Sequence, residues 1–350
     1  MSRASERLRS AFIGCGPRAG EHAAAYSGVT RGRVVAACAR TRVHAERFCR
    51  AFGIERSYDD PASMLEAERP DLLHIITDPG QRIALMSLAA EHRVPVVIVE
   101  KPIAIEGEDR ARIADLADRT ATRFVVNTQL RFHPRLLALR DDVAEGRVGE
   151  IRFIDTSAAS TILDQGVHLL DLAHWFADHA LPRQVIAQVS GVSALDSDQP
   201  CPDITSLLIR FEGDVRTLLV SGDIASLIEP KEPFYMQKRI AVYGSTGYVH
   251  WTMFGWERVT RLGGYATGRH VYAEEDTRAQ AALTDAAFAL LEGGDQVHPT
   301  NLTRSLKQFD VVLAGYVSAL EHRPIDLPFQ APDHLLDALR SGLHRAEPSS

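Results

Sequence analysis

Short apolar runs alternate with helical segments along roughly the first 125 residues. The apolar runs, which are typical of strands, are RSAFIG, RVVAACA, LLHIIT, VPVVIVE and RFVVN. The helical segments between them are HAAAYS, VHAERFCRAFG, RIALMSLAAEH and DRARIADLADR. Strands that alternate with helices in this way predict a parallel, doubly wound sheet with helices on both faces.

The pattern changes after residue 150. Six strand-like runs lie between residues 151 and 262, several of them joined by glycine-containing turns: IRFIDTSA, QVIAQVSGVSAL, ITSLLIRFEG, VRTLLVSGDI, KRIAVYGSTG and YVHWTMF. One helix, around LLDLAHWFA, interrupts them. Two more helices follow, one stopped by Gly293 and Gly294 and one capped by Asn301, and they should cover one sheet face. These runs predict a second, α+β domain with an antiparallel sheet, and we place the domains at residues 1–126 and 127–345.

Composition narrows the classes of partner. The chain has 350 residues, 45% of them hydrophobic, which is enough for two domain cores. A net charge of −7 with both signs scattered predicts neither a nucleic-acid surface nor a membrane surface, so small molecules and copies of the chain itself are the expected partners. The polar start and the short apolar stretch AFIG predict a cytoplasmic protein.

The four cysteines give no sign of a disulfide framework or a zinc knuckle. Cys15, Cys38, Cys49 and Cys201 show no C-x-x-C spacing. We therefore interpret all four as reduced thiols in the interior.

A glycine-rich turn follows the first predicted strand and precedes a helix. It reads Gly14-Cys15-Gly16-Pro17-Arg18-Ala19-Gly20, which matches the dinucleotide fingerprint G-x-G-x-x-G/A in the context that the fingerprint requires. Gly14 permits the tight turn, Gly16 lets the backbone approach a pyrophosphate, and Ala19 keeps the helix close to the sheet. The helix N-terminus attracts the phosphate charge. An ordinary glycine-rich turn is the alternative.

The end of the second predicted strand indicates which dinucleotide binds. NAD sites place an Asp or Glu there for the adenosine ribose, but this strand ends in Ala39-Arg40-Thr41-Arg42. A 2′-phosphate would be repelled by an acid and bound by a guanidinium and a hydroxyl. We therefore predict NADP(H), bound by Arg40 and Thr41, with NAD as a possible alternative.

Lys101 follows the buried run VPVVIVE directly. Ligands of doubly wound sheets bind beyond the carboxyl ends of the strands, so Lys101 is expected beside the nicotinamide. Its ammonium could stabilise an alkoxide while a hydride is transferred. A surface lysine with no role in the chemistry is the alternative.

A second polar cluster lies at residues 164–171. Asp164, His168 and Asp171 are spaced by four and three residues and would share one face of a helix. His168 could act as general acid or base, Asp164 could orient the reacting hydroxyl, and Asp171 could fix the imidazole tautomer. His174 would point elsewhere and is interpreted as structural. There are two alternatives to this catalytic interpretation. One is a structural histidine held by nearby carboxylates, and the other is a metal site on these three residues.

Taken together, the Gly14-Cys15-Gly16 loop, the Glu100-Lys101-Pro102 motif and the Asp164, His168, Asp171 group resemble the glucose-fructose oxidoreductase, inositol dehydrogenase and MocA family. The resemblance runs from residue 10 to about residue 328. It implies a Rossmann domain followed by an α/β domain with an open, mostly antiparallel sheet, whose exposed face pairs subunits into homodimers or homotetramers. It also implies that Lys101, Asp164 and His168 are catalytic.

The resemblance extends to further residues of the cofactor site. Gln129 stands where many members carry an asparagine near the nicotinamide, and Arg131 stands on a frequent arginine. Arg82 replaces the usual histidine. Only the six residues from Ala158 to Leu163 lead from the strand run IRFIDTSA to Asp164, where members carry a longer loop. The predicted cofactor-binding residues are Gly14, Gly16, Pro17, Arg18, Ala19, Arg40, Thr41, Thr77, Glu100, Lys101 and Gln129.

These observations predict an NADP(H)-dependent oxidoreductase that interconverts a hydroxyl and a ketone on a sugar, cyclitol or related polyol, with no metal. One alternative is an enzyme whose tightly bound NAD(P) supports elimination or hydrolysis without net redox change. Another is a non-catalytic nucleotide-binding regulatory protein.

Overall fold

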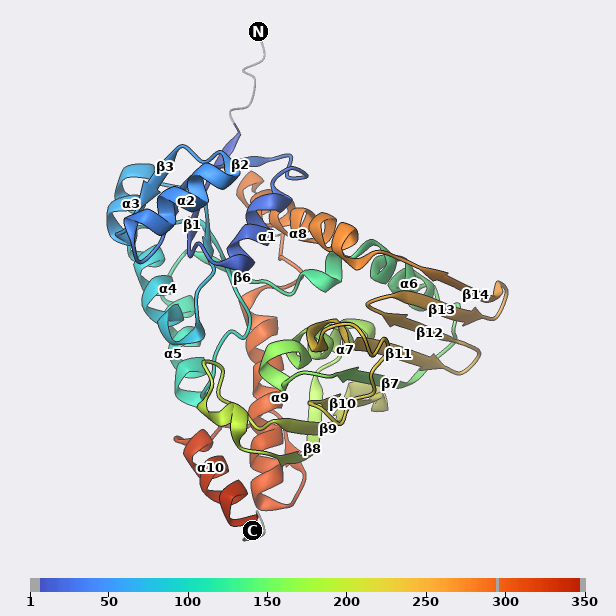
Figure 1. The fold of residues 1–350 in the computed structure, drawn as a ribbon. Helices are drawn as coiled ribbons and strands as arrows, with labels where there is room; N and C mark the ends of the chain where they lie inside the picture. Colours follow the sequence, from blue (N-terminus) through green and yellow to red (C-terminus); the bar gives the residue numbers. More distant parts are fainter. Residues whose placement is uncertain (1–6, 294–295, 347–350) are drawn as a thin grey trace. The chain divides into compact units, whose positions relative to one another are not determined.

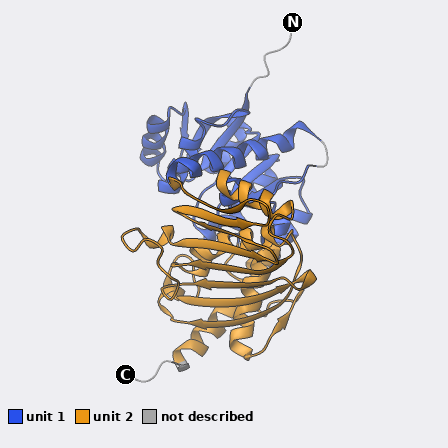
Figure 2. Ribbon diagram, turned by 90° about the vertical axis from the view of Figure 1, so that its right-hand side faces the viewer, with its two compact units in different colours: residues 1–103, 111–133, 273–305 blue, residues 104–110, 134–272, 306–350 orange. Residues whose placement is uncertain are grey.

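The structure is a computed structural model that describes residues 7–293 and 296–346 of the chain. The chain forms two compact units (Figure 2). Unit 1 comprises residues 1–103, 111–133 and 273–305, and unit 2 comprises residues 104–110, 134–272 and 306–350. Each unit therefore collects segments that are distant in sequence, whereas the sequence predicted one boundary between residues 126 and 127. The predicted Gly294 stop lies outside the described residues.

Unit 1 is built around a six-stranded parallel sheet in the order β3-β2-β1-β4-β5-β6. Figure 1 labels β1, β2, β3 and β6 in this sheet. Its strands are β1 (Leu8–Ile13), β2 (Gly32–Cys38), β3 (Arg56–Tyr58), β4 (Leu72–Ile75), β5 (Val96–Val99) and β6 (Arg123–Val126). The helices are α1 (Pro17–Ala25), α2 (Arg42–Phe52), α3 (Pro61–Glu68), α4 (Arg82–Glu91) and α5 (Gly107–Asp118). Every residue of β4 and β5 is buried, as expected for continuous apolar runs in a parallel sheet. The predicted doubly wound sheet is confirmed.

Helix α8 (Tyr272–Ala289) follows the second sheet in the chain but packs into unit 1. Its Leu283 and Phe288 are fully buried against Val96, Ile98 and Val125 of the parallel sheet. The sequence had placed this helix in the C-terminal domain, because a 3.6-residue period shows that a helix has an apolar face but not which sheet that face covers.

Unit 2 is built around a nine-stranded sheet in the order β14-β13-β12-β11-β7-β10-β9-β8-β15. Its strands are β7 (Ile151–Ala158), β8 (Pro182–Ser190), β9 (Ile204–Phe211), β10 (Arg216–Ser221), β11 (Lys238–Gly244), β12 (Tyr248–Thr252), β13 (Gly255–Thr260), β14 (Gly264–Arg269) and β15 (Ile325–Asp326). The pairs are antiparallel except for β7 with β10, which is parallel. The sheet is thus mostly antiparallel, as predicted, with β13, β14 and β15 added to the six predicted strands.

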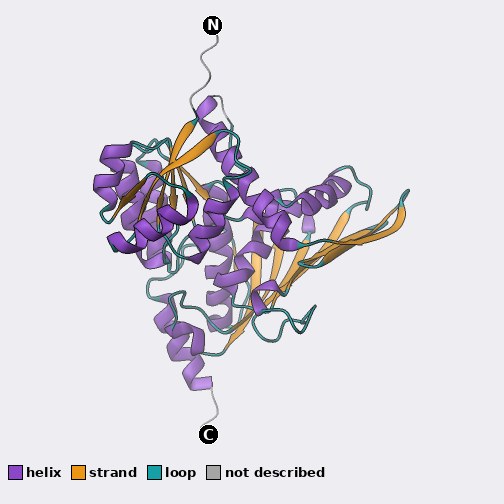
Figure 3. Ribbon diagram, turned by 45° about the horizontal axis from the view of Figure 1, so that its top comes forward, coloured by secondary structure: helices purple, strands orange, loops and turns teal. Residues whose placement is uncertain are grey.

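Helices lie along one side of this sheet, which Figure 3 shows nearly edge-on. They include α6 (Pro134–Ala144), α7 (Val167–Phe176) and α9 (Leu302–Glu321), while α10 (Leu335–Ala346) packs beside α9, where a Cβ at Gly342 would lie 3.1 Å from Leu320 Cδ2. Helix α9 approaches the strands closely: Ser318 Oγ accepts a hydrogen bond from the Ala187 N–H at 3.0 Å, and a Cβ at Gly315 would lie 2.5 Å from Leu207 Cδ2. Asn301 caps α9 as predicted, because its Oδ1 accepts from the Arg304 N–H at 3.2 Å.

The cysteines and helices of the described part of the chain can be compared with the sequence. Cys15, Cys38, Cys49 and Cys201 are free thiols. Burial raises the pKa of Cys15 to about 12, so the thiol in the glycine loop stays protonated at neutral pH. None of the described helices combines the length and the apolar character needed to cross a membrane.

Candidate active site

The glycine loop between β1 and α1 has two glycines with different requirements. Gly14 has φ +106°, and a Cβ there would lie 2.0 Å from the Ile76 carbonyl oxygen, so the fold itself requires glycine. A Cβ at Gly16 would meet no protein atom within 4 Å. The space around Gly16 is therefore open, and it lies beside the N-terminus of α1. Pro17 is the first residue of that helix, and Ala19 is fully buried. This is the arrangement that a bound pyrophosphate needs.

Arg18 turns its guanidinium toward carboxylates of its own unit. It forms an ion pair with Glu21, its Nε lies 3.3 Å from Glu100 Oε1, and its Nη2 lies 3.4 Å from Gln280 Oε1. Arg18 thus helps to neutralise a buried acid, and its predicted contact with the cofactor stays a prediction.

Arg40 and Thr41 are exposed at the carboxyl end of β2. Arg42 lies 3.4 Å from Glu46 on the same helix, whereas Arg40 makes no hydrogen bond or ion pair with any described residue. The neighbouring strand β3, which the sequence pattern did not predict, places Tyr58 opposite Cys38 and brings Asp59 near this strand end. An acid that follows β3 therefore lies close to the position where β2 itself lacks one.

Glu100 is buried at the end of β5 and is held by three donors. Its Oε1 accepts from His22 Nε2 and Asn127 Nδ2, both at 2.7 Å, and lies 3.3 Å from Arg18 Nε. Burial would raise the pKa of Glu100, but Arg18, His22 and Lys101 outweigh it and hold that pKa well below its ordinary value. Glu100 is thus an ionised anchor of the strand end that carries Lys101, and its predicted contact with the cofactor stays a prediction.

The network continues from Glu100 into the sheet through two histidines. His22 Nδ1 lies 3.3 Å from His74 Nδ1, and His74 Nε2 lies 2.8 Å from the Tyr26 hydroxyl. Burial lowers the pKa of both histidines, that of His74 well below its ordinary value. Burial also raises the pKa of Tyr26, so Tyr26 keeps its proton. With both rings neutral, each hydrogen bond of the network has one donor and one acceptor. Tyr26 donates to His74, His74 donates to His22, and His22 donates to Glu100.

We expect this network to make the stability of the protein depend on pH. Burial lowers the pKa of both histidines in the folded chain, so each takes up a proton at lower pH there than in the unfolded chain, where a histidine takes one up below about pH 6.5. Stability should therefore fall as the pH drops below 6.5, by up to about 1.4 kcal/mol per pH unit for each histidine. His74→Gln should flatten this slope in urea unfolding between pH 7 and pH 5. The exposed His44→Gln is the matched control. Equal slopes in His74→Gln and the unsubstituted chain would contradict the assignment of a neutral His74.

Arg82 explains how the loop at Lys101 is held. This guanidinium is 1% exposed and donates to the carbonyl oxygens of Pro102 and Thr77, the latter at 2.8 Å. Burial lowers the pKa of Arg82 to about 10, which leaves it charged at neutral pH. Arg82 therefore joins the backbone that follows β4 to the backbone that follows β5. Although it replaces the usual histidine, Arg82 has a structural role at these two loops. Lys101 itself is half-buried.

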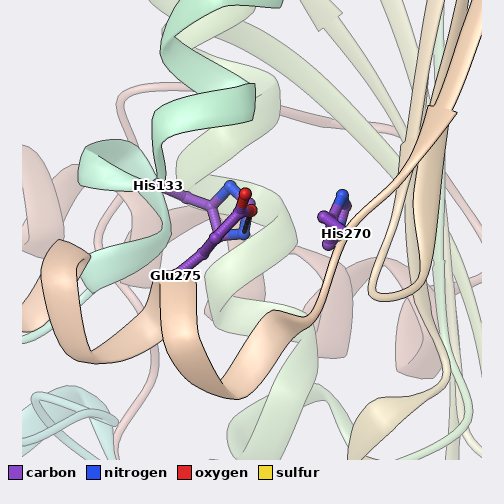
Figure 4. A group of neighbouring side chains, drawn as sticks. All are labelled: His133, His270 and Glu275. Atoms are coloured by element: carbon purple, nitrogen blue, oxygen red, sulfur yellow. Dashed lines mark ion pairs between the residues drawn. The ribbon is translucent and has the colours of Figure 1, made fainter.

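Gln129, another predicted contact of unit 1, lies after β6. Gln129 Nε2 donates to Asp276 Oδ1 of α8 at 3.0 Å. Next to it, His133 Nε2 lies 2.9 Å from Glu275 Oε2, and Figure 4 shows these two side chains pointing toward each other. The segment 129–133 is thus tied to the start of α8. The predicted roles of Gln129 and Thr77 at the cofactor stay predictions.

Asp164 lies in a π-helical turn, Ile162–Gly166, that leads into α7. Ser160 Oγ donates to its Oδ2 at 2.6 Å, Gln165 Nε2 donates to its Oδ1 at 3.1 Å, and Thr161 Oγ1 accepts from its backbone N–H at 3.3 Å. The sequence predicted one regular helix face over residues 164–171. That prediction is correct for His168 and Asp171, but the wider π turn changes the position of Asp164.

His168 and Asp171 are both buried in α7. Asp171 Oδ1 accepts from Gln308 Nε2 of α9 at 2.7 Å, and in the described part of the chain the ligand atoms of Asp164, His168 and Asp171 do not gather as a metal site requires. His174 stacks on Phe211 with 5.8 Å between ring centroids, which fits the structural role predicted for it. The orienting role of Asp171 on His168 stays a prediction.

The structure therefore groups the predicted residues in two sets. Unit 1 holds the glycine loop, Arg40, Thr41, Thr77, Glu100, Lys101 and Gln129, and unit 2 holds Asp164 and His168. Sequence reasoning did not identify His22, His74 or Asn127. Of these three, only His74 had a signal in the sequence, because it is a polar residue inside the otherwise apolar run LLHIIT.

Two family models match the chain. A model of an oxidoreductase family with an NAD-binding Rossmann fold matches residues 8–128, and a GFO/IDH/MocA C-terminal domain model matches residues 155–250. Together the two matches cover more than half of the 350 residues.

Individual proteins agree with the family models. The D-apiose dehydrogenase of Paraburkholderia graminis is 25% identical over 92% of this chain and 90% of its own length. The inositol 2-dehydrogenase of Rhizobium meliloti is 25% identical over 69% of this chain and 74% of its own length. A crystal structure of an Agrobacterium radiobacter oxidoreductase in complex with NAD+, L-tartaric acid and magnesium has a TM-score of 0.79 at 22% identity, covering 92% of this chain and 98% of that one. The structural likeness confirms the fold.

Proposed function

Because the chain belongs to the glucose-fructose oxidoreductase, inositol dehydrogenase and MocA family of oxidoreductases, we propose that it is an NADP(H)-dependent enzyme that interconverts a hydroxyl and a ketone on a sugar, cyclitol or related polyol. One observation carries the proposal. The glycine loop follows β1 and Lys101 follows β5, so both lie at the carboxyl edge of one parallel sheet. Dinucleotides bind at that edge in such sheets.

The chemical roles go to Lys101, His168 and Asp164. In the direction of ketone reduction, the carbonyl oxygen gains negative charge, which the Lys101 ammonium would stabilise. His168 would give this oxygen a proton and would take it back in the reverse direction. Asp164 would accept a hydrogen bond from the substrate hydroxyl and hold it in place. Bound nicotinamide would supply or accept the hydride at C4.

Arg40 supports NADP(H) as the preferred cofactor. It is exposed at the end of β2 and has no described partner, so its guanidinium can take a 2′-phosphate. Asp59, which follows the neighbouring strand β3, supports NAD as the alternative, and so does the NAD+ bound to the Agrobacterium radiobacter oxidoreductase.

The open face of the second sheet supports association between copies of the chain. Ile186 of β8 and Leu208 of β9 are paired across the two strands, and 44% and 41% of their surfaces are exposed. Tyr243 of β11 is 40% exposed. Large apolar side chains gathered on one sheet are typical of a subunit interface, so we propose a homodimer or homotetramer through this face.

A substrate screen tests the proposed function. Purified protein would be mixed with NADPH and a panel of ketonic and oxidised sugars and cyclitols, with D-apiose and myo-inositol tested in the reverse direction with NADP+. We expect at least one compound to change the absorbance of the reduced nicotinamide. Product formed without net change in NADPH, with nucleotide retained through purification, would instead support the redox-neutral alternative. Nucleotide binding with no turnover of any compound would support a regulatory protein.

A further inference from the structure

Lys238 is a buried lysine at the start of β11 in unit 2. Its partner in the β-sheet register is Ala158, the last residue of β7. The chain leaves β7 there and passes through Ser160 to the π turn that carries Asp164. Lys238 is only 4% exposed, whereas Lys231, in the preceding loop, is exposed.

The ammonium of Lys238 begins a chain of hydrogen bonds that ends on Asp164. Lys238 Nζ donates to Gln165 Oε1 at 2.6 Å and to the Tyr235 carbonyl oxygen. Gln165 Nε2 then donates to Asp164 Oδ1 at 3.1 Å. Since Ser160 Oγ donates to Asp164 Oδ2 at 2.6 Å, both carboxylate oxygens accept a hydrogen bond from the protein.

A lysine has a property here that an uncharged side chain lacks. Its ammonium can only donate, so the Gln165 amide must turn its oxygen toward Lys238 and its NH2 group toward Asp164. Without that donor the amide could rotate and present its oxygen to the carboxylate, which would repel it. The charge of Lys238 therefore selects the one amide orientation that holds Asp164.

Packing alone does not account for the charge of Lys238. Burial of an ammonium is unfavourable unless it is well paired, and an apolar side chain of similar length would fill the same space. The preceding loop has a second tie in Gln237, whose side chain bonds the backbone of Ile228, Glu229 and Glu232. The chain of hydrogen bonds through Gln165 to Asp164 uses the one property that separates Lys238 from an apolar side chain of the same length, which is its donating cation.

We propose that Lys238 is a positioning residue that acts through Gln165 to fix the carboxylate of Asp164. The proposal rests on the role given to Asp164 in the proposed function. It adds two residues, Lys238 and Gln165, to the side chains that determine how well the substrate hydroxyl is held.

The first test is structural and needs no substrate. Crystal structures would be determined for the unsubstituted chain, for Lys238→Met, and for the exposed control Lys231→Met. In Lys238→Met we expect the Gln165 amide to turn and the Asp164 carboxylate to change rotamer or lose order. Unchanged Gln165 and Asp164 side chains would overturn the proposal. Gln165→Met, judged by the same Asp164 rotamer, takes the place of Lys238→Met if that variant does not fold.

The second test is kinetic and uses the compound from the panel that the unsubstituted enzyme turns over fastest. We expect Lys238→Met to lower kcat/KM by about 10- to 100-fold, because a displaced carboxylate no longer holds the hydroxyl. The KM for NADPH should stay unchanged, and the acidic limb of the kcat/KM profile should move to higher pH, because a cation near Asp164 is lost. Lys238→Arg should restore much of the activity.

A double-variant comparison separates this role from general damage to the fold. Because Lys238 and Gln165 act in series, Lys238→Met with Gln165→Met should lose no more activity than either single variant. Additive losses, or an unshifted pH profile, would overturn the proposal. If no compound is turned over at all, the proposed function fails, and the crystal structures still decide whether Lys238 fixes Asp164.

Discussion

Lys101→Ala is expected to lower turnover with NADPH by about 10²- to 10³-fold, the usual cost of removing one group that stabilises a developing oxyanion. The substitution should leave NADPH binding nearly unchanged, because the proposed phosphate contacts lie at the glycine loop and at Arg40. The fold should also persist, since Arg18 and His22 still hold Glu100 when the Lys101 charge is gone. Stopped-flow or steady-state absorbance of NADPH measures turnover, and fluorescence titration measures binding.

Lys307→Ala is the matched control for this experiment. Lys307 is one of only four lysines in the chain and is exposed on α9. We expect this control variant to keep full turnover. If Lys101→Ala turned over substrate as fast as the control, the ammonium would have no part in the chemistry.

Arg40→Ala is expected to change the choice of cofactor. Loss of charge-assisted hydrogen bonds to a 2′-phosphate costs about 1.5–3 kcal/mol, which corresponds to a rise of about 10- to 150-fold in the KM for NADPH. The KM for NADH should change little or fall, because NADH lacks the phosphate and Asp59 remains available nearby. Steady-state kinetics with both nucleotides measures the ratio.

Arg42→Ala provides the comparison for Arg40. The Arg42 guanidinium is already 3.4 Å from Glu46, so its removal should raise the KM for NADPH less than that of Arg40. An enzyme that prefers NADH before any substitution would make NADP the wrong assignment, and Asp59, just after β3, would then be the candidate for the acid missing from β2.

The central strands of the parallel sheet were predictable because all four residues of each are buried, so their sequences are mostly apolar: β5 is VVIV, and β4 is LLHI with His74 as its one polar residue. Strand β3 was not, since its three residues, Arg56, Ser57 and Tyr58, carry no apolar run. The helix after it did have a signal: Asp60 accepts a hydrogen bond from the Ser63 N–H at 2.7 Å and Pro61 is the first helical residue.

The candidate site was predictable where chemistry depends on a local motif and was not where it depends on tertiary contacts. The glycine loop and Glu100-Lys101-Pro102 are short segments at strand ends. In contrast, the partners of Glu100 come from residues 22 and 127, and the partner of Gln165 comes from residue 238. Hydrophobic periodicity carries no information about such pairings, and the π turn at Asp164 has no distinctive sequence pattern.

Transfer of deuterium tests the central claim most directly. NADPH deuterated at the transferring position of nicotinamide C4 would be supplied with the ketonic compound that the enzyme reduces. Mass spectrometry should then find one deuterium on the new carbinol carbon for each NADPH oxidised. Product that forms without deuterium, or without consumption of NADPH, would contradict hydride transfer between the cofactor and the substrate.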